Sequence, residues 1–177
     1  MPTSNQSGVR SKLEEFFITA LQEIYWSEQS LINVLTTMIG AATTSELKEA
    51  FEKHREQTQG HVERLEKVFG LLNAAPQAEP SVGLQGLFDE GWQVIDETQE
   101  GSAQRDVALI MAAQKVEHYE IACYGSLITF ARTMQRNEIA ELLIPILNEE
   151  KETDLLLTEI AEGKINYEAS QEEAQTA

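Results

Sequence analysis

Four long stretches of helical periodicity constrain this chain more than any other feature. They cover roughly residues 12–38, 45–72, 102–134 and 137–161. Each is about twice the length of an average globular helix, as helical bundles require. No stretch alternates apolar and polar residues as a half-buried strand would. Only short connections, Gly40 to Thr44 and Gln135 to Asn137, separate the first pair and the last pair. Because short connections make consecutive helices antiparallel neighbours, the pattern predicts an all-α protein built from two helical hairpins.

A longer segment joins the two hairpins. Pro76 and Pro80 mark residues 73–82 as a loop. Residues 84–98 then show apolar side chains at helical spacing, which predicts a shorter fifth helix. Two hairpins joined by one long crossover form the topology of a ferritin-like antiparallel four-helix bundle. We expect one domain over residues 1–165 and a polar, flexible tail over residues 166–177. Pro145 either kinks the last long helix or marks a late start of it.

The charge balance excludes several functional classes. The chain has 30 acidic and 13 basic residues among 177, for a formal net charge of −17. Such a surface repels nucleic-acid phosphates and anionic membranes. We also find no apolar run of membrane-spanning length and no secretion signal in the sequence. The single cysteine, Cys123, excludes an intramolecular disulfide and favours a reducing, cytoplasmic setting.

Acidic side chains lie at the centres of the predicted apolar stripes. At 100° per residue, the apolar residues flanking Glu28 in the first helix fall within about 40° of it. Glu117 and Glu150 have the same position in the last two helices, and His61 has it in the second. Glu120 and Asp154 lie close beside the stripes of their own helices. The candidate metal ligands are therefore Glu28, His61, Glu117, Glu120, Glu150 and Asp154.

Carboxylates gathered at one level of a core require compensation. Buried charges are generally paired or bound to metal, and several neighbouring carboxylates cannot all ionise without cations. We therefore expect one or two ions of Fe or Mn and no organic cofactor, and in a two-ion site Glu117 and Glu150 would bridge the ions. Bundles of this kind use one Glu from each of two helices and Glu-x-x-His from the other two. This chain departs from that pattern, because Gln57 replaces a carboxylate, and Gly60 and Thr153 replace the histidines.

Three segments carry a resemblance to a known family. YWSEQSL, HREQTQGHVERLEKVF and LIMAAQKVEHYEIACYGSL are similar to the YciF/YciE family of bacterial stress proteins. The resemblance implies a fold close to that of rubrerythrin, a homodimer and an association with general stress, but no known reaction. The pair Glu117 and Glu120 is similar to the pair of ligands that the third long helix carries in rubrerythrin-type sites. Within the family the position of Gln57 can be Glu, so a complete two-metal site does not follow from the resemblance.

Other interpretations of the same residues stay open. One hypothesis is a metal protein that reacts with oxygen or peroxide, with Tyr25 and Tyr124 donating hydrogen bonds to the ligands. The alternative is a non-catalytic dimeric stress protein that binds another protein, in which the acidic core is a remnant satisfied by shared protons. Iron storage in a cage is a third and weaker option. We interpret His54 as structural, His118 as a surface residue and Cys123 as an interface thiol.

Overall fold

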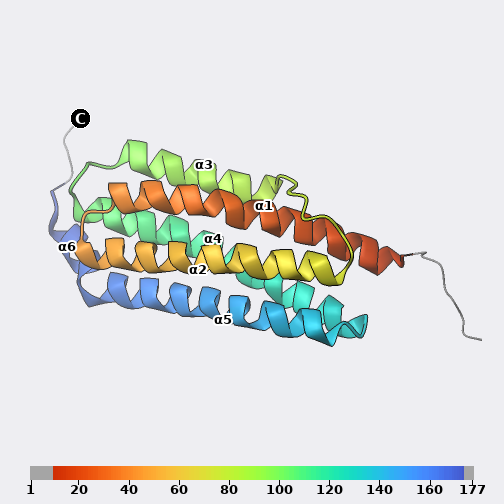
Figure 1. Ribbon diagram of the computed structural model, residues 1–177. Coiled ribbons are helices and arrows are strands. Elements are labelled where there is room, and N and C mark those ends of the chain that lie inside the picture. Colours follow the sequence, from red (N-terminus) through yellow and green to blue (C-terminus); the bar gives the residue numbers. More distant parts are fainter. Residues whose placement is uncertain (1–9, 174–177) are drawn as a thin grey trace, which may run out of the picture.

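The computed structural model describes residues 10–173, and this range contains helices and no strand. The predicted all-α class is confirmed, with ends close to the expected ones (Figure 1). A one-turn π-helix, Ala161–Ile165, links the last long helix to a short one. The α-helices are α1 (Lys12–Ala41), α2 (Ser45–Leu71), α3 (Val82–Glu97), α4 (Ala103–Thr133), α5 (Asn137–Ile160) and α6 (Asn166–Gln171).

Hydroxyl side chains mark the starts of the first four helices. Each accepts a hydrogen bond from the backbone N–H three residues later, which satisfies one of the free donors of the first turn. These N-cap residues are Ser11, Thr44, Ser81 and Ser102. Before α5, Gln135 has a φ of 59°, which reverses the chain within a very short turn. The helix starts are therefore encoded locally.

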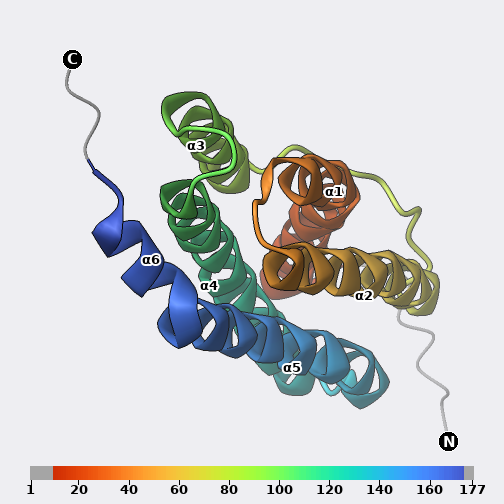
Figure 2. The same cartoon turned by 90° about the vertical axis from the view of Figure 1, so that its left-hand side faces the viewer.

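The four long helices pack along their lengths around one core. Contacts join α1 to α2, α4 to α5, α2 to α5 and α1 to α4. Helix α3 lies outside this set, against α4 and, more lightly, α1 (Figures 1 and 2). Apolar side chains form two separate clusters, one around Phe17, Phe69 and Leu143 and the other around Leu35, Phe51 and Leu109. A polar layer lies between them, at mid-length of the bundle.

Two expectations about the last helices can be compared with the structure. Helix α5 begins at Asn137 and continues through Pro145, so that proline does not mark a late start. Part of the expected tail is helical, because α6 reaches Gln171. Glu172 then accepts hydrogen bonds from the backbone N–H groups of Ala103 and Gln104 at the start of α4. Residues 174–177 lie outside the described range.

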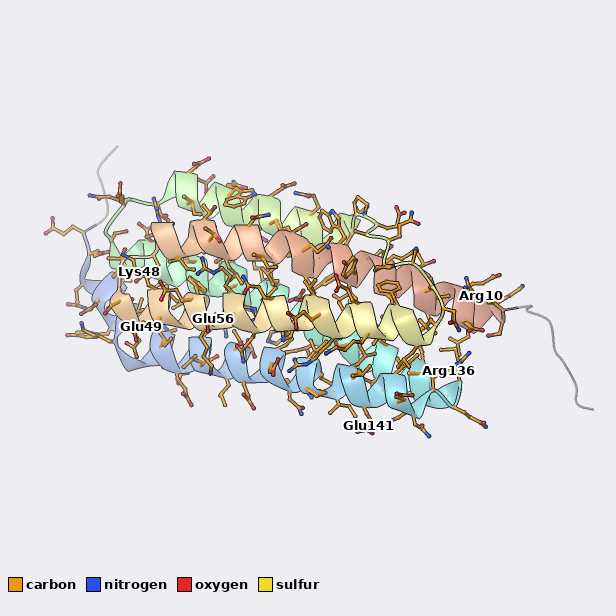
Figure 3. All side chains as sticks on the ribbon, viewed as in Figure 1. Arg10, Lys48, Glu49, Glu56, Arg136 and Glu141 are labelled. Atoms are coloured by element: carbon orange, nitrogen blue, oxygen red, sulfur yellow. The ribbon has the colours of Figure 1, made fainter. Side chains whose placement is uncertain are left out.

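The acidic surface follows the outer faces of the helices. Glu49 and Glu56 on α2 and Glu141 on α5 are exposed (Figure 3). Their exposure contrasts with the burial of the acids in the polar layer. Within residues 10–173, no helix combines the length and the apolar character that a bilayer crossing needs.

Candidate metal centre

The polar layer brings together side chains from all four long helices. None of them is more than 2 % exposed, although each could carry a charge. The apolar clusters on either side exclude water from both directions along the bundle. The layer consists of Glu28 of α1, His54 and His61 of α2, Glu117 and Glu120 of α4, and Glu150 of α5.

Two overlapping sets of these residues have the geometry to hold a metal ion. One set is His54, Glu117, Glu120 and Glu150, and the other is Glu28, His61 and Glu150. Within each set, one potential ligand atom per residue lies within 4.8 Å of all the others. Glu150 belongs to both sets, as its predicted bridging position requires. Glu117, the second predicted bridge, belongs to one set.

His61 lies between three carboxylates. Its Nδ1 is 3.2 Å from Oε2 of Glu28 and 3.0 Å from Oε1 of Glu150. Its Nε2 is 2.8 Å from Oε2 of Glu149, which Arg64 holds with both guanidinium nitrogens. Burial alone would lower the pKa of His61, but Glu28 and Glu150 raise it to about 11. A histidine that donates one ring N–H to a carboxylate and turns the other nitrogen to the site is a recurring arrangement around metals.

His54 differs from His61 in charge because of its burial, and Thr153 determines which of its ring nitrogens carries the hydrogen. The Thr153 hydroxyl donates its only hydrogen to the Glu149 carbonyl oxygen, 3.0 Å away. Its oxygen must therefore accept the Nδ1–H of His54, which is 3.3 Å from it. Burial lowers the pKa of His54, so the ring is neutral and its Nε2 carries a lone pair. That lone pair faces Oε1 of Glu117 at 3.2 Å and Oε2 of Glu150 at 3.7 Å.

The buried oxygens around His54 lack hydrogen-bond donors. The contacts of Glu117 and Glu150 with the two histidines are short, but several do not have the direction of a hydrogen bond. Burial raises the pKa of both carboxyl groups to about 8 and raises that of Glu120 well above its usual value. Among the described residues, the buried side-chain atoms without a partner are His54 Nε2, Glu117 Oε2, and both carboxylate oxygens of Glu120 and of Glu150.

This donor set fits a divalent cation. Every partnerless atom among the described residues belongs to the first of the two sets. The atoms are carboxylate oxygens and one imidazole nitrogen, the ligands that suit Fe and Mn. A dication would neutralise the acids and use the lone pairs that no protein donor reaches. Buried His and Glu groups that could hold a metal ion are therefore present, while the identity of the ion stays open.

The surrounding residues agree with the sequence analysis only in part. Tyr124 donates a short hydrogen bond to Oε1 of Glu28, as expected, whereas Tyr25 donates to Glu66 outside the layer. Asp154 lies outside both sets and is 23 % exposed. Its carboxylate contacts His118 at 3.3 Å and the Gln114 amide at 3.1 Å. As a metal ligand, Asp154 remains an untested prediction.

Two residues of the centre were not among the predicted ligands. His54 was interpreted as structural, yet its position seven residues before His61 places both rings on the same face of α2. The spacing of seven residues could therefore have added His54 to the predicted ligands. Glu149 next to Glu150 gives no such signal, because adjacent helical residues point about 100° apart. Only the packing of α2 against α5 shows that Glu149 reaches His61.

Comparisons with known proteins agree with the resemblance. The model of a family described as a domain of unknown function, DUF892, matches residues 12–170. The Escherichia coli protein YciF is 39 % identical over 158 residues, which is 89 % of this chain and 95 % of YciF. The crystal structure of YciF, which is described as a stress protein, superposes with a TM-score of 0.83 and covers 89 % of this chain and 99 % of that chain.

Two further structures support the same fold. YcfI of Rhodopseudomonas palustris is 33 % identical with a TM-score of 0.80, covering 89 % of this chain and 98 % of its own. A Xanthomonas campestris protein, 23 % identical with a TM-score of 0.68, covers 88 % and 94 % and shows the fold alone. The family match spans nearly the whole described chain, including every helix that contributes to the polar layer. The chain therefore belongs to the DUF892 family, which is the family of YciF.

Proposed function

We propose that this protein is a ferritin-like bundle that binds two Fe or Mn ions in its polar layer. His54, Glu117, Glu120 and Glu150 would hold one ion, and Glu28, His61 and Glu150 the other. The observation that carries the proposal is the neutral His54 ring. Its Nε2 lone pair faces the carboxyl groups of Glu117 and Glu150, which no donor from outside the layer reaches. Without a cation these acids keep their protons, and with a cation the same atoms form a ligand set.

The chemistry follows from the ions and from the protons of the layer. Bound Fe²⁺ or Mn²⁺ would supply electrons to oxygen or peroxide; for iron, two Fe²⁺, one O₂ and two protons give two Fe³⁺ and one H₂O₂. Before metal arrives, Glu117 and Glu150 hold protons at neutral pH, since the pKa of each is about 8. Metal binding displaces such protons, so affinity rises with pH. A role in the stress response is consistent with the name of the YciF structure.

Glu117→Gln tests the proposal directly. In a metal protein, this change lowers the metal content and abolishes the rise in melting temperature that Fe²⁺ or Mn²⁺ causes. Metal content is measured by elemental analysis after expression in medium rich in iron and manganese. Glu56→Gln, at an exposed position of α2, is the matched control. A wild-type protein that is purified without metal, and whose melting temperature ignores both ions, contradicts the proposal.

One observation favours a second candidate, a non-catalytic dimeric stress protein that binds another protein. The charged His61 ring and the Tyr124 hydroxyl already contact both oxygens of Glu28, so this part of the layer is satisfied without metal. Exposed Phe16, in edge-on ring contact with Phe130, offers an apolar surface for a second copy. In this case Glu117→Gln is neutral or stabilising, with no effect of metal. Sedimentation at increasing protein concentration tests the homodimer separately.

A further inference from the structure

A small cavity lies beneath α3, next to the polar layer. It lies among α1, α3 and α4 and has a volume of about 20 Å³. Its lining includes Leu35 and Met38 of α1, Leu87 and Gly91 of α3, and Val116 and Glu117 of α4. Leu87 and Gly91 are half-buried and form its outer end, whereas the α1 and α4 residues are buried. Helix α3 therefore covers a small cavity whose lining includes Glu117 of the candidate metal centre.

Glu117 gives this cavity its polar inner end. It is the one lining residue that is not apolar, and it is 2 % exposed. Its Oε2 has no hydrogen-bond partner, while its Oε1 faces His54. A molecule that crosses the cavity would thus arrive beside a member of the first metal set.

Size and lining restrict what can pass. The volume is roughly that of one water-sized probe, so organic substrates are excluded. An apolar lining offers no hydrogen bonds to replace those that a polar molecule gives up on leaving water. Hydrogen peroxide would therefore lose its hydrogen bonds to water in the cavity, whereas an uncharged apolar diatomic molecule has none to lose. The lining thus favours an apolar diatomic molecule over hydrogen peroxide.

A second approach to the layer has the opposite character. Between α2 and α5, Arg64 and Glu149 are 31 % and 25 % exposed, and Glu149 contacts His61 directly. This charged rim is therefore the side on which the layer comes nearest to partly exposed polar groups. The two sides of the centre thus differ in chemistry.

We propose that the cavity beneath α3 admits dioxygen to the Glu117 side of the centre, while polar reactants enter between α2 and α5. The inference rests on the proposed function for its chemistry, although the passage itself is a property of the metal-free protein. Gly91 is its gate residue. A Cβ at Gly91 meets nothing within 4 Å, so a larger side chain can be accommodated there without a backbone clash.

The first experiment needs no metal. Dissolved oxygen is paramagnetic, so methyl relaxation is measured by NMR under oxygen pressure in the metal-free wild type. Methyl groups of Leu35 and Val116 should relax at least about twice as fast as those of Leu65 and Leu21, which are equally buried but line no cavity. Gly91→Leu should remove that excess, and Gly86→Leu, an exposed glycine of the same helix outside the cavity, should keep it. Equal relaxation at all four wild-type sites overturns the passage.

The second experiment uses the iron-loaded protein. Gly91→Leu should slow oxidation by dioxygen about tenfold or more, with Fe²⁺ affinity and the rate with hydrogen peroxide unchanged, and Gly86→Leu should change none of these. Val116→Leu, which fills the cavity from α4, should reproduce the effect if the leucine at residue 91 turns outward. Equal slowing with both oxidants contradicts the selectivity. If the wild type does not bind Fe²⁺, the proposed function is contradicted instead. The relaxation experiment then tests the oxygen passage by itself.

Discussion

Two carboxylates of α4, Asp106 and Glu120, are equally buried and serve opposite purposes. Both are 0 % exposed. Asp106 accepts the backbone N–H groups of Thr43 and Thr44 at 2.6 and 2.9 Å, so it ties the start of α4 to the turn between α1 and α2. Neither oxygen of Glu120 has a hydrogen-bond partner.

The difference separates structure from function. A buried carboxylate whose oxygens accept hydrogen bonds from backbone N–H groups stabilises the fold, and its removal leaves those donors unpaired. A buried carboxylate that accepts no hydrogen bond lowers the stability of the fold, which indicates a role in binding a ligand or an ion. Burial and acidity are the same in both regions, so the partners alone distinguish them.

The largest expected effect is a loss of stability with rising pH in the metal-free protein. Glu117 and Glu150, each with a folded pKa of about 8, contribute stability that is complete below pH 4.5 and lost as the pH rises through 8. His61, at about 11, adds a loss above pH 6.5. One such carboxyl group alone accounts for roughly 4 kcal/mol between pH 5 and pH 8, so urea unfolding should show a decrease of at least that size. Saturating Mn²⁺ should remove this slope, and a flat profile without metal would contradict it.

Asp106→Ala should cause the next largest change. It leaves two backbone N–H groups at the α1–α2 turn without their acceptor, at a cost of about 3 kcal/mol. Urea unfolding measures the cost at pH 5, where the layer is least strained. Asp96→Ala, at an exposed position of α3, is the control. Metal affinity should stay unchanged, and a loss of metal binding would break the distinction between the two carboxylates.

Glu120→Gln should act in the opposite direction. In the metal-free protein at pH 8, it removes a crowded carboxylate and should stabilise the fold by about 1 kcal/mol. The same change should weaken Mn²⁺ binding in calorimetry, because it deletes a ligand of the first set. If Glu120→Gln destabilises the metal-free protein as strongly as Asp106→Ala, then Glu120 is structural and the comparison fails.

Glu149→Gln should have the smallest effect on stability. The Glu149 carboxylate is partly exposed and lies beside Arg64, so its loss should cost less than about 1 kcal/mol. Metal affinity should nevertheless fall about tenfold, because the Nε2–H of His61 loses the carboxylate that orients the ring. Calorimetry and urea unfolding on the same samples separate the two outcomes. Glu63→Gln, at an exposed position of α2, is the control.

Much of this architecture could be predicted from residues that act locally. Ser11, Thr44 and Ser102 mark the helix starts, and the short turns before α2 and α5 determine which helices are neighbours. The periodicity of the apolar residues placed Glu28, His61, Glu117, Glu120 and Glu150 on the inner faces. Asp154, about 40° from Glu150 on the same helix, lies outside both sets and contacts His118, so its role as a ligand stays a prediction.

The sequence by itself determined the helices, their pairing and the acidic layer, because periodicity and capping depend on neighbours within a few residues. Tertiary structure alone decided which acids are satisfied. Asp106 finds its donors 62 and 63 positions away, and Glu149 reaches His61 across 88 positions. Thr153, which replaces an expected histidine, fixes the tautomer of His54 from another helix. Such partners depend on how the helices pack. The periodicity of the sequence therefore predicts which charged side chains are buried, and the packed structure shows which groups compensate their charge.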